Sequence, residues 1–241
     1  MADITTKNLR NVCLLGHGGS GKTSLAEAML FCAGEIDRMG KVGDGNTVTD
    51  FDPEEVARHY SVSLAAANIY YHDTKINILD TPGYPDFVGE ELQGIRAADA
   101  AVIMVDGKGG AEVGTELAWE YCDRQGLPRV FFVNKCDDPE SNFDRVLTQL
   151  KDKFGIRVCP AMVPVDHKGK KTFISLAERM AYTFDERGKR SEDPMDDELR
   201  SVVDKYTQQF NEAIAETSDE LMEKFFNEEE ITREEAVNAL H

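Results

Sequence analysis

The sequence lacks long apolar segments and paired cysteines. No apolar run approaches the roughly 20 residues that a membrane-spanning helix needs, and the N-terminus shows no secretory signal pattern. The five cysteines are scattered, without a C-x-x-C pair and without a zinc-like spacing to the five histidines. These absences argue against a membrane protein, a disulfide scaffold and structural zinc. They favour a reducing compartment, with the cytoplasm as the expected location.

Positive charge is also scarce. The 27 Lys and Arg residues are outnumbered by 45 Asp and Glu residues, which gives a formal net charge of −18. Direct binding to nucleic acid is not expected, because sequence-independent binding depends on Lys and Arg at phosphates. The acidic excess is largest from Asp185 onward, where 18 acidic residues face 7 basic ones. That segment is either a solvated helical surface or a docking face for a basic protein.

Apolar strands and helices alternate through the first part of the chain. Strands are expected at residues 62–71, 75–79, 100–105 and 129–133, and helices at 113–124 and 142–154. This alternation predicts an α/β fold with a mostly parallel sheet and helices on both faces. The polar, glycine-punctuated stretch of residues 34–60 has no sustained apolar period, so it is expected to be functional or mobile.

The character of the chain changes near residue 156. Short strands are expected at 157–165, 172–176 and 181–184, followed by a helix over 196–216 with an apolar stripe. Capping-box patterns at Thr217…Glu220 and Thr232…Glu235 predict two further helices. We therefore expect a core domain over residues 1–155 and a small α+β subdomain over 156–241.

A glycine-rich segment, GHGGSGKTS, follows the apolar residues 12–15 and leads into a helical pattern. This is the context that the phosphate-binding pattern G-x-x-x-x-G-K-[ST] requires. Glycines let backbone amides turn inward around a phosphate, and the helix N-terminus favours negative charge. Lys22 is expected to reach the β- and γ-phosphates, and the Thr23 hydroxyl to bind Mg²⁺. The expected phosphate-binding residues are Gly16, His17, Gly18, Gly19, Ser20, Gly21, Lys22, Thr23 and Ser24.

Two later motifs also follow apolar strands. The second motif of the chain is Asp80-Thr81-Pro82-Gly83, and the third is Asn134-Lys135-Cys136-Asp137. Asp80 is expected to approach Mg²⁺ through water, and the Gly83 amide to meet a γ-phosphate and report its loss. In Asn134-Lys135-Cys136-Asp137 the carboxylate can accept two hydrogen bonds from a guanine edge, which adenine lacks. The Lys135 stem can lie over the base, and Asn134 can tie its loop to the phosphate loop. The expected nucleotide-binding residues of these motifs are Asp80, Thr81, Pro82, Gly83, Tyr84, Asn134, Lys135 and Asp137.

With these motifs the chain resembles the GTP-binding domain of the translational GTPases, a P-loop G domain, and most of all elongation factor G and its paralogues. The resemblance covers essentially all 241 residues and is carried by residues 16–31, 50–65, 80–90 and 134–137. The acidic segment 216–235 resembles the insert in the G domain of elongation factor G. The resemblance implies that the stretch 34–60 is switch I and that Ser61 is a second hydroxyl ligand of Mg²⁺.

Three departures from the family pattern change what is expected. His59 stands where the family has glycine, and Tyr84 stands where elongation factor G has a histidine implicated in arranging the attacking water. A phenol with a pKa near 10 is no substitute for an imidazole near neutral pH, so slow intrinsic hydrolysis is expected. No final sheet strand and closing helix are recognisable after residue 227. We therefore expect a fragment of a longer protein with reduced guanine affinity.

The resemblance implies a switch that binds GTP and GDP and hydrolyses GTP with Mg²⁺, with Lys22, Gly83 and Tyr84 as catalytic residues. The ribosome is the implied partner through the full-length protein, with a basic ribosomal protein as a candidate at the acidic insert. One alternative is a guanine-nucleotide-responsive binding module with negligible hydrolysis. Another is a ribosome protection or release factor with the same core. An ATP-dependent enzyme is disfavoured by Asp137.

Overall fold

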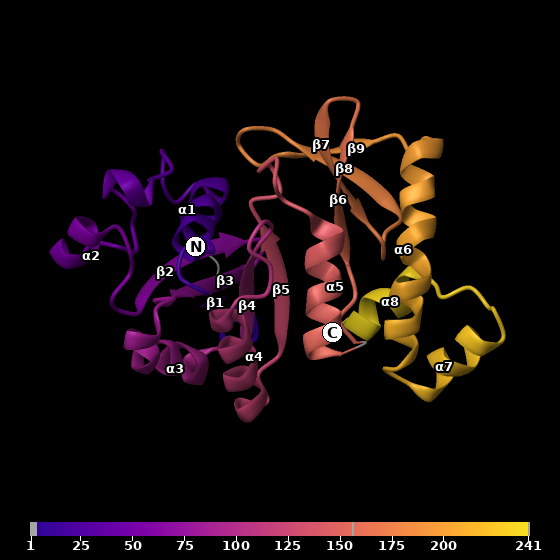
Figure 1. The fold of residues 1–241 in the computed structure, drawn as a ribbon, viewed down its shortest axis with the longest axis horizontal. Helices are drawn as coiled ribbons and strands as arrows, with labels where there is room; N and C mark the ends of the chain where they lie inside the picture. The colour runs from indigo at the N-terminus through magenta and orange to yellow at the C-terminus, as the bar shows by residue number, and fades with distance from the viewer. Residues whose placement is uncertain (1–3, 156, 241) are drawn as a thin grey trace. The chain divides into compact units, whose positions relative to one another are not determined.

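The chain folds into two compact units that divide between Lys135 and Cys136 (Figure 1). The computed structural model describes residues 4–155 and 157–240. The division describes how the chain packs and does not test the domain boundary expected near residue 155, which stays a prediction. None of the described helices is long and apolar enough to cross a membrane.

The first unit is built on a five-stranded sheet in the order β2-β3-β1-β4-β5. The four strands from β3 to β5 run parallel, and only β2 is antiparallel to its neighbour β3. The strands are β1 (Leu9–Gly16), β2 (Ala65–Tyr71), β3 (Thr74–Asp80), β4 (Ala100–Asp106) and β5 (Arg129–Asn134). The helices are α1 (Lys22–Ala33), α2 (Pro53–Arg58), α3 (Val88–Ala97) and α4 (Val113–Gln125), with 3₁₀ turns η1 (Thr6–Asn8), η2 (Val42–Asp44) and η3 (Pro85–Phe87).

Helices cover both faces of this sheet because side chains alternate between the faces along each strand. On β1, Leu14 points to one face and packs with Leu30 of α1 and Ile78 of β3. Its neighbour Leu15 points to the other face, in a cluster with residues of α3 and α4. The expected mostly parallel sheet with helices on both faces is confirmed.

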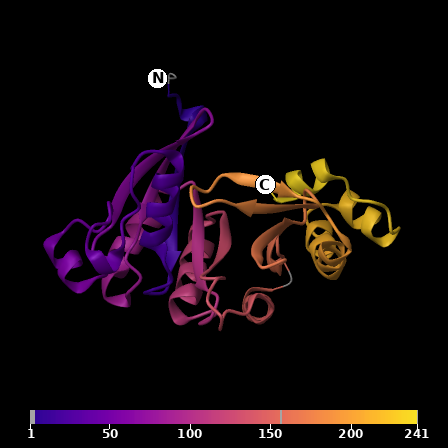
Figure 2. The ribbon, with the colours of Figure 1, turned by 90° about the horizontal axis from the view of Figure 1, so that it is seen from above.

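The sheet topology brings the three motifs to one edge. In a parallel sheet the carboxyl ends of the strands lie together. β1 runs into the phosphate loop at Gly16, β3 ends at Asp80, and β5 ends at Asn134 beside Asp106 of β4. At the opposite end, η1 lies beside the β2–β3 turn, where the Asn8 side-chain amide donates to the carbonyl of Asp73 at 2.9 Å (Figure 2).

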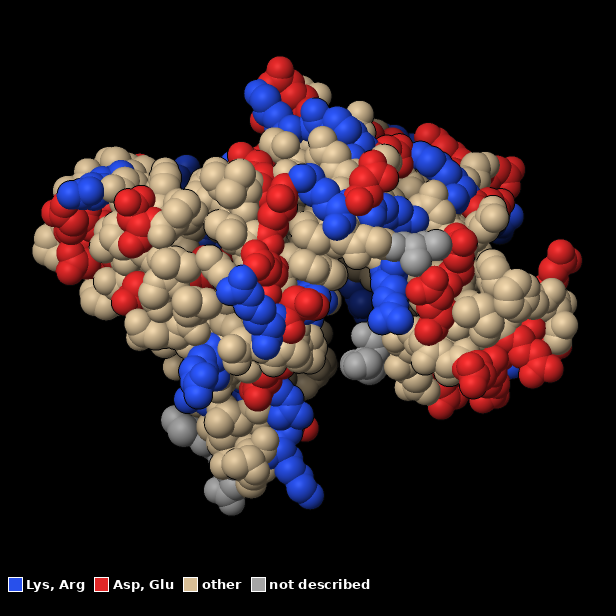
Figure 3. Space-filling view, turned by 60° about the horizontal axis from the view of Figure 1, so that its bottom comes forward, with Lys and Arg blue, Asp and Glu red and all other residues tan. Residues whose placement is uncertain are grey.

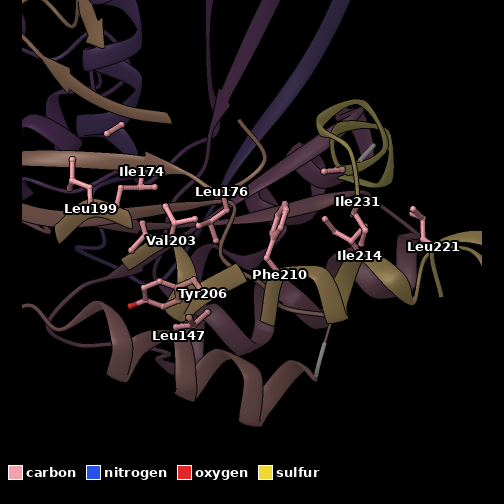
Figure 4. Close-up of a cluster of buried hydrophobic side chains, with 13 residues drawn as sticks. Leu147, Ile174, Leu176, Leu199, Val203, Tyr206, Phe210, Ile214, Leu221 and Ile231 are labelled. Carbon is pink, nitrogen blue, oxygen red and sulfur yellow. The ribbon is translucent and has the colours of Figure 1, made fainter. Parts of the chain in front are cut away.

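In its described residues the second unit pairs an antiparallel sheet, in the order β6-β7-β8-β9, with four helices. Its core is a cluster to which β7, α5 and α6 contribute, and Figure 4 shows Leu147, Ile174 and Phe210 pointing into it. The expected α+β character of this part is confirmed. The strands are β6 (Met162–His167), β7 (Lys170–Ser175), β8 (Met180–Phe184) and β9 (Arg190–Asp193), and the helices are α5 (Phe143–Phe154), α6 (Asp197–Ala215), α7 (Asp219–Phe226) and α8 (Arg233–Leu240).

Two sequence expectations for the second unit need correction. The strand expected at 157–165 begins only at Met162, and residue 156 beside it lies outside the described residues. Pro160, two residues before the strand begins, has no backbone N–H to offer to a sheet. The cap of α7 is Ser218, whose hydroxyl accepts from the amide of Leu221, and not the adjacent Thr217.

Candidate functional site

The loop between β1 and α1 has a backbone that only glycine adopts easily. Gly16, Gly19 and Gly21 have φ angles of 126°, 80° and 98°, in the left-handed region that side chains disfavour. Close neighbours add a second constraint: a Cβ on Gly16 would collide with the carbonyl oxygen of Met104, and one on Gly21 with the side-chain amide of Asn134. The glycines expected from the motif are therefore required by this fold of the loop.

The side chain of Lys22 binds back to the start of this loop. Its side chain is buried, and its ammonium donates to the carbonyl oxygens of Gly16 at 2.9 Å and His17 at 3.1 Å. Burial lowers the pKa of Lys22, and the nearby carboxylate of Asp80 opposes that effect most strongly. α1 begins at Lys22 itself, so the first amides of the helix have no intrahelical acceptor. A buried cation and these amides together form a cradle for an anion.

The segment after β3 packs directly on this cradle. A Cβ on Gly83 would collide with the ammonium of Lys22 and lie 2.8 Å from the amide nitrogen of Gly18. The Thr81 hydroxyl, buried one residue after β3 ends, donates to the carbonyl of Leu14 at 2.6 Å. Pro82 lies between these two anchored residues. Only a glycine at 83 lets the two loops approach so closely.

A cluster of hydroxyls and carboxylates lies beside Lys22. The hydroxyl oxygens of Thr23 and Ser61 are 3.2 Å apart, and the Thr49 hydroxyl donates to Asp80 Oδ2 at 2.7 Å. Asp80 is 1% exposed, and among the described residues its Oδ1 has no hydrogen-bond partner. Burial raises the pKa of Asp80 to about 6, although Thr49, Thr23 and Lys22 oppose the shift. The buried carboxyl of Asp50 adds a like charge that raises the Asp80 pKa further.

This cluster fits Mg²⁺. The ion prefers hard oxygen ligands, and Thr23, Ser61 and the unpartnered oxygen of Asp80 supply that type of atom. A cation here would also relieve the cost of two neighbouring buried carboxylates. No group of three His, Cys, Asp or Glu residues suited to a metal occurs in the described ranges. Phosphate oxygens and water would therefore have to complete the coordination.

Two buried glutamates, which the sequence motifs did not single out, hold the polar stretch of residues 34–60 and the residues just after it. Glu27 of α1 accepts from the amides of Gly40 at 2.7 Å and Val48 at 2.5 Å. Glu55 of α2 accepts from the amides of Val62 at 2.9 Å and Ser63 at 3.0 Å. Charge-assisted bonds of this kind are among the stronger ones in proteins. The stretch expected to be functional or mobile is thus anchored by one side chain of α1 and by one of its own.

His59 adopts a left-handed backbone conformation, which glycine reaches without steric cost. It caps α2 with φ 58° and ψ 37°, and its amide donates to the carbonyl of Glu55 at 2.8 Å. Its ring Nδ1 lies 3.1 Å from the carbonyl oxygen of Val42, a hydrogen bond when Nδ1 carries the proton. The left-handed conformation costs a residue with a side chain about 1–2 kcal/mol. The added ring contact offsets part of this cost.

Tyr84 takes part in an aromatic contact between the segment after β3 and the end of the polar stretch of residues 34–60. Its ring lies 4.8 Å from that of Tyr60, centroid to centroid, and Tyr60 lies 6.5 Å from Phe87. The Tyr60 hydroxyl accepts from Arg58 at 2.9 Å. On its other side the Tyr84 ring packs against Gly18, where a Cβ would lie 3.1 Å from Cζ. The position of Tyr84 above the phosphate loop is therefore fixed from both sides.

The end of β5 contacts the phosphate loop through two carbonyl groups. The Asn134 side-chain amide donates to the carbonyl of Ser20 at 2.9 Å, and the Lys135 ammonium donates to that of Gly19 at 2.8 Å. Asn134 thus ties its loop to the phosphate loop, in the arrangement expected from the sequence. Asp137 belongs to the second unit, two residues later. Its role at a guanine base stays a prediction.

A partly buried carboxyl on α3 predicts a pH effect on stability. Burial raises the pKa of Glu91 to about 7, so the folded chain binds more protons than the unfolded chain between about pH 4.5 and 7. Stability of the ligand-free first unit should therefore fall as the pH rises through this window. Glu91→Gln removes this titrating group. After allowance for partial exposure, we expect the free energy of unfolding to fall by about 1–2 kcal/mol less across this pH window in Glu91→Gln than in the wild type.

Urea unfolding at several pH values, followed by the fluorescence of the single tryptophan, measures this effect. Trp119 packs on the same cluster as Ile95 of α3, so it reports on the relevant helix. Glu120→Gln, which removes an exposed carboxylate paired with Arg124 on α4, controls for the loss of one charge. An unchanged pH dependence in Glu91→Gln would contradict the assignment.

Comparisons with known proteins agree with this geometry. Residues 7–240 match the family described as the elongation factor Tu GTP binding domain. The chain is 35% identical over 224 residues to an elongation factor G-like protein of Mycobacterium tuberculosis, covering 92% of this chain and 31% of that protein. It is 42% identical over 169 residues to the mitochondrial ribosome-releasing factor 2 of Culex quinquefasciatus, covering 70% of this chain and 23% of that protein.

A solved structure supports the same assignment. The crystal structure of a Thermus thermophilus protein superposes with a TM-score of 0.86 at 37% identity, covering 95% of this chain and 34% of that one. The chain spans about a third or less of the length of these relatives. The family match extends over nearly all of the described residues. The chain therefore belongs to the translational GTPases, as a G domain of the elongation factor G type.

Proposed function

We propose that this chain is the guanine-nucleotide switch of a ribosome-associated translation factor and that it hydrolyses GTP to GDP and phosphate slowly on its own. The observation that carries the proposal is the meeting of three segments at one point. Lys22 of the phosphate loop, Gly83 of the second motif and Ser61, which directly follows the proposed switch I of residues 34–60, converge on the anion cradle. A ligand with a terminal phosphate would touch all three, and a diphosphate would lose that contact.

In this proposal the chain's own residues mainly bind and position. Phosphoryl transfer to water needs positioning and charge neutralisation, with little covalent work for the protein. Lys22 and the loop amides would hold the β- and γ-phosphates, and the Gly83 amide would face the γ-phosphate. Thr23 and Ser61 would hold Mg²⁺ directly, with Asp80 and Asp50 behind them. Bound Mg²⁺ would neutralise charge on the phosphate oxygens.

A substitution at Tyr84 distinguishes the two proposed functions, a GTP hydrolase and a nucleotide-responsive binding module. Its phenol, 44% exposed above Gly18, can orient a water molecule but cannot supply an imidazole near neutral pH. In a full-length protein we expect Tyr84→His to raise ribosome-stimulated single-turnover hydrolysis by about 10-fold or more, since a positioned acid–base group contributes roughly 10²–10⁴-fold. The measurement is the rate of phosphate release from GTP with and without ribosomes.

The control for this experiment is Tyr70→His, which changes an exposed tyrosine on β2 in the same way. Measurable hydrolysis in the wild type, raised by Tyr84→His and unaffected by Tyr70→His, supports the GTPase. Negligible turnover in both the wild type and Tyr84→His, with GTP binding intact, would replace it with the alternative of a nucleotide-responsive binding module.

The proposed setting is the cytoplasm, where the free cysteines of the described residues would stay reduced. The proposed partner is the ribosome, reached through the full-length protein. Figure 3 shows acidic side chains gathered on part of one face of the molecule. The last helices carry exposed acidic residues, and those of α7 include Asp219, Glu220 and Glu223. This surface is a candidate face for a basic ribosomal protein. One relative is named a ribosome-releasing factor, so a release function of the whole protein is the second candidate.

A further inference from the structure

The carboxylate of Asp106 is fully engaged at the edge of the sheet where the phosphate loop lies. It ends β4, and its Oδ1 accepts from the amides of Lys108 at 2.8 Å and Gly109 at 2.9 Å. Its Oδ2 accepts from the ammonium of Lys135 at 2.7 Å. Burial by itself raises the pKa of Asp106, but the bonds from Lys135 and the two amides outweigh it and lower the pKa. Asp106 is therefore a charged anchor at neutral pH.

Lys135 joins this anchor to the phosphate loop. Its ammonium, held by Asp106, also donates to the carbonyl of Gly19 at 2.8 Å. Its backbone has φ 55°, a left-handed conformation that costs a non-glycine residue energy and persists only where the surroundings hold it. With a carboxylate beside it, the ammonium is already neutralised. Lys135 therefore acts here by position more than by its charge.

The contact on Gly19 fixes the shape of the loop. A trans peptide places its carbonyl and its N–H on opposite sides. When the Gly19 carbonyl turns outward to Lys135, the Ser20 amide turns inward, where it donates to the carbonyl of His17 at 3.2 Å. When the Ser20 carbonyl turns outward to Asn134, the amide of Gly21 is directed to the inner side. Losing the Lys135 contact would remove the charge-assisted bond on the first of these peptides and leave the longer bond from the Ser20 amide to the His17 carbonyl to hold it.

We propose that Asp106 is a positioning residue of this site, which acts through Lys135 to hold the phosphate loop in the shape that binds a nucleoside diphosphate or triphosphate. The role in positioning is inferred from the contacts of Lys135 with Asp106 and Gly19. The identity of the ligand rests on the proposed function. None of the sequence motifs includes Asp106, because Lys135, through which it acts, lies 29 positions away along the chain.

The experiment is Asp106→Asn in the 241-residue chain. Asparagine keeps an oxygen for the amides of Lys108 and Gly109, but it presents an NH₂ group to the ammonium of Lys135, donor against donor. The matched control is Asp123→Asn on α4, which makes the same charge change at an exposed pair with Arg129. Two readouts are used: hydrogen exchange of residues 16–24 without nucleotide, and the dissociation rate of a fluorescent GDP.

Exchange of residues 16–24 is expected to be about fivefold faster in Asp106→Asn than in the wild type, because the loop opens more often. GDP dissociation is expected to be about 10-fold faster. Asp123→Asn should change neither. In a Lys135→Met background, Asp106→Asn should add less than about twofold, since residues that act through one contact are not additive.

Unchanged hydrogen exchange in Asp106→Asn overturns the proposal. It is also overturned if the fold-change in the double variant equals the product of the fold-changes in Asp106→Asn and Lys135→Met. If the wild-type chain binds no GDP, the proposed function fails, but the exchange measurement still decides whether Asp106 positions the loop. The two failures are therefore distinguishable.

Discussion

Replacing Lys22 by methionine is expected to weaken GDP binding by about 100-fold or more. Charge-assisted hydrogen bonds are worth roughly 1.5–3 kcal/mol each, and Lys22 is the buried cation of the cradle. The substitution also removes the ammonium that opposes the raised pKa values of Asp80 and Glu91, so their burial becomes more costly. Both effects disfavour a bound polyphosphate. Titration with fluorescent GDP in the presence of Mg²⁺ measures the loss.

The control is Lys7→Met, which removes an exposed lysine on η1 at the opposite end of the sheet. It should leave GDP affinity within about twofold, because screened surface charges contribute little. Circular dichroism and thermal melting must show that Lys22→Met still folds. A folded Lys22→Met chain that binds GDP as tightly as the wild type would remove the phosphate loop from the proposed site.

Replacing Asp137 by asparagine is expected to exchange the preferred base. A carboxylate accepts from both donors of guanine, N1–H and the N2 amine, whereas an amide presents one acceptor and one donor. GDP affinity should therefore fall by about 100-fold, because unpaired polar groups on a bound base are penalised strongly. Xanthosine diphosphate, with a carbonyl oxygen in place of the amine, should bind better to Asp137→Asn than to the wild type.

The neighbouring Asp138 offers a matched control. Its Oδ1 accepts from the amide of Glu140 at 2.8 Å, a bond that asparagine keeps. Asp138→Asn should leave the order of the two nucleotides unchanged. Competition of each nucleotide against fluorescent GDP gives both affinities. If Asp137→Asn shifts neither affinity, the base is recognised elsewhere.

The parts of the site that could be predicted from the sequence are those in which the chemistry restricts the residue type. Positive φ at Gly16 and Gly21 and the close approach at Gly83 leave no alternative to glycine. The strands leading into these residues are apolar because both faces of the sheet are covered. Local sequence therefore carried enough information to place the phosphate loop and the second motif on one sheet edge.

The anchors that hold these loops depend on contacts between residues far apart in the chain. Glu27 binds amides 13 and 21 positions later, and nothing in its own neighbourhood marks it as buried. α2 did have a local signal, since Asp52, Pro53 and Glu55 form a capping box with proline at the first turn. β9 gave none, because Arg190–Asp193 is polar throughout and almost entirely exposed. Periodicity detects buried faces, and β9 has no buried face to detect.

The most direct test of the central claim is a titration of the chain with fluorescent GDP, competed by unlabelled GDP and by ATP, with and without Mg²⁺. We expect displacement by GDP, no displacement by ATP at the same concentrations, and tighter binding with Mg²⁺. Displacement by ATP as effective as that by GDP would contradict a guanine switch. If no binding is found, repeating the titration on a longer protein that contains this chain would separate a wrong base assignment from a weakened site.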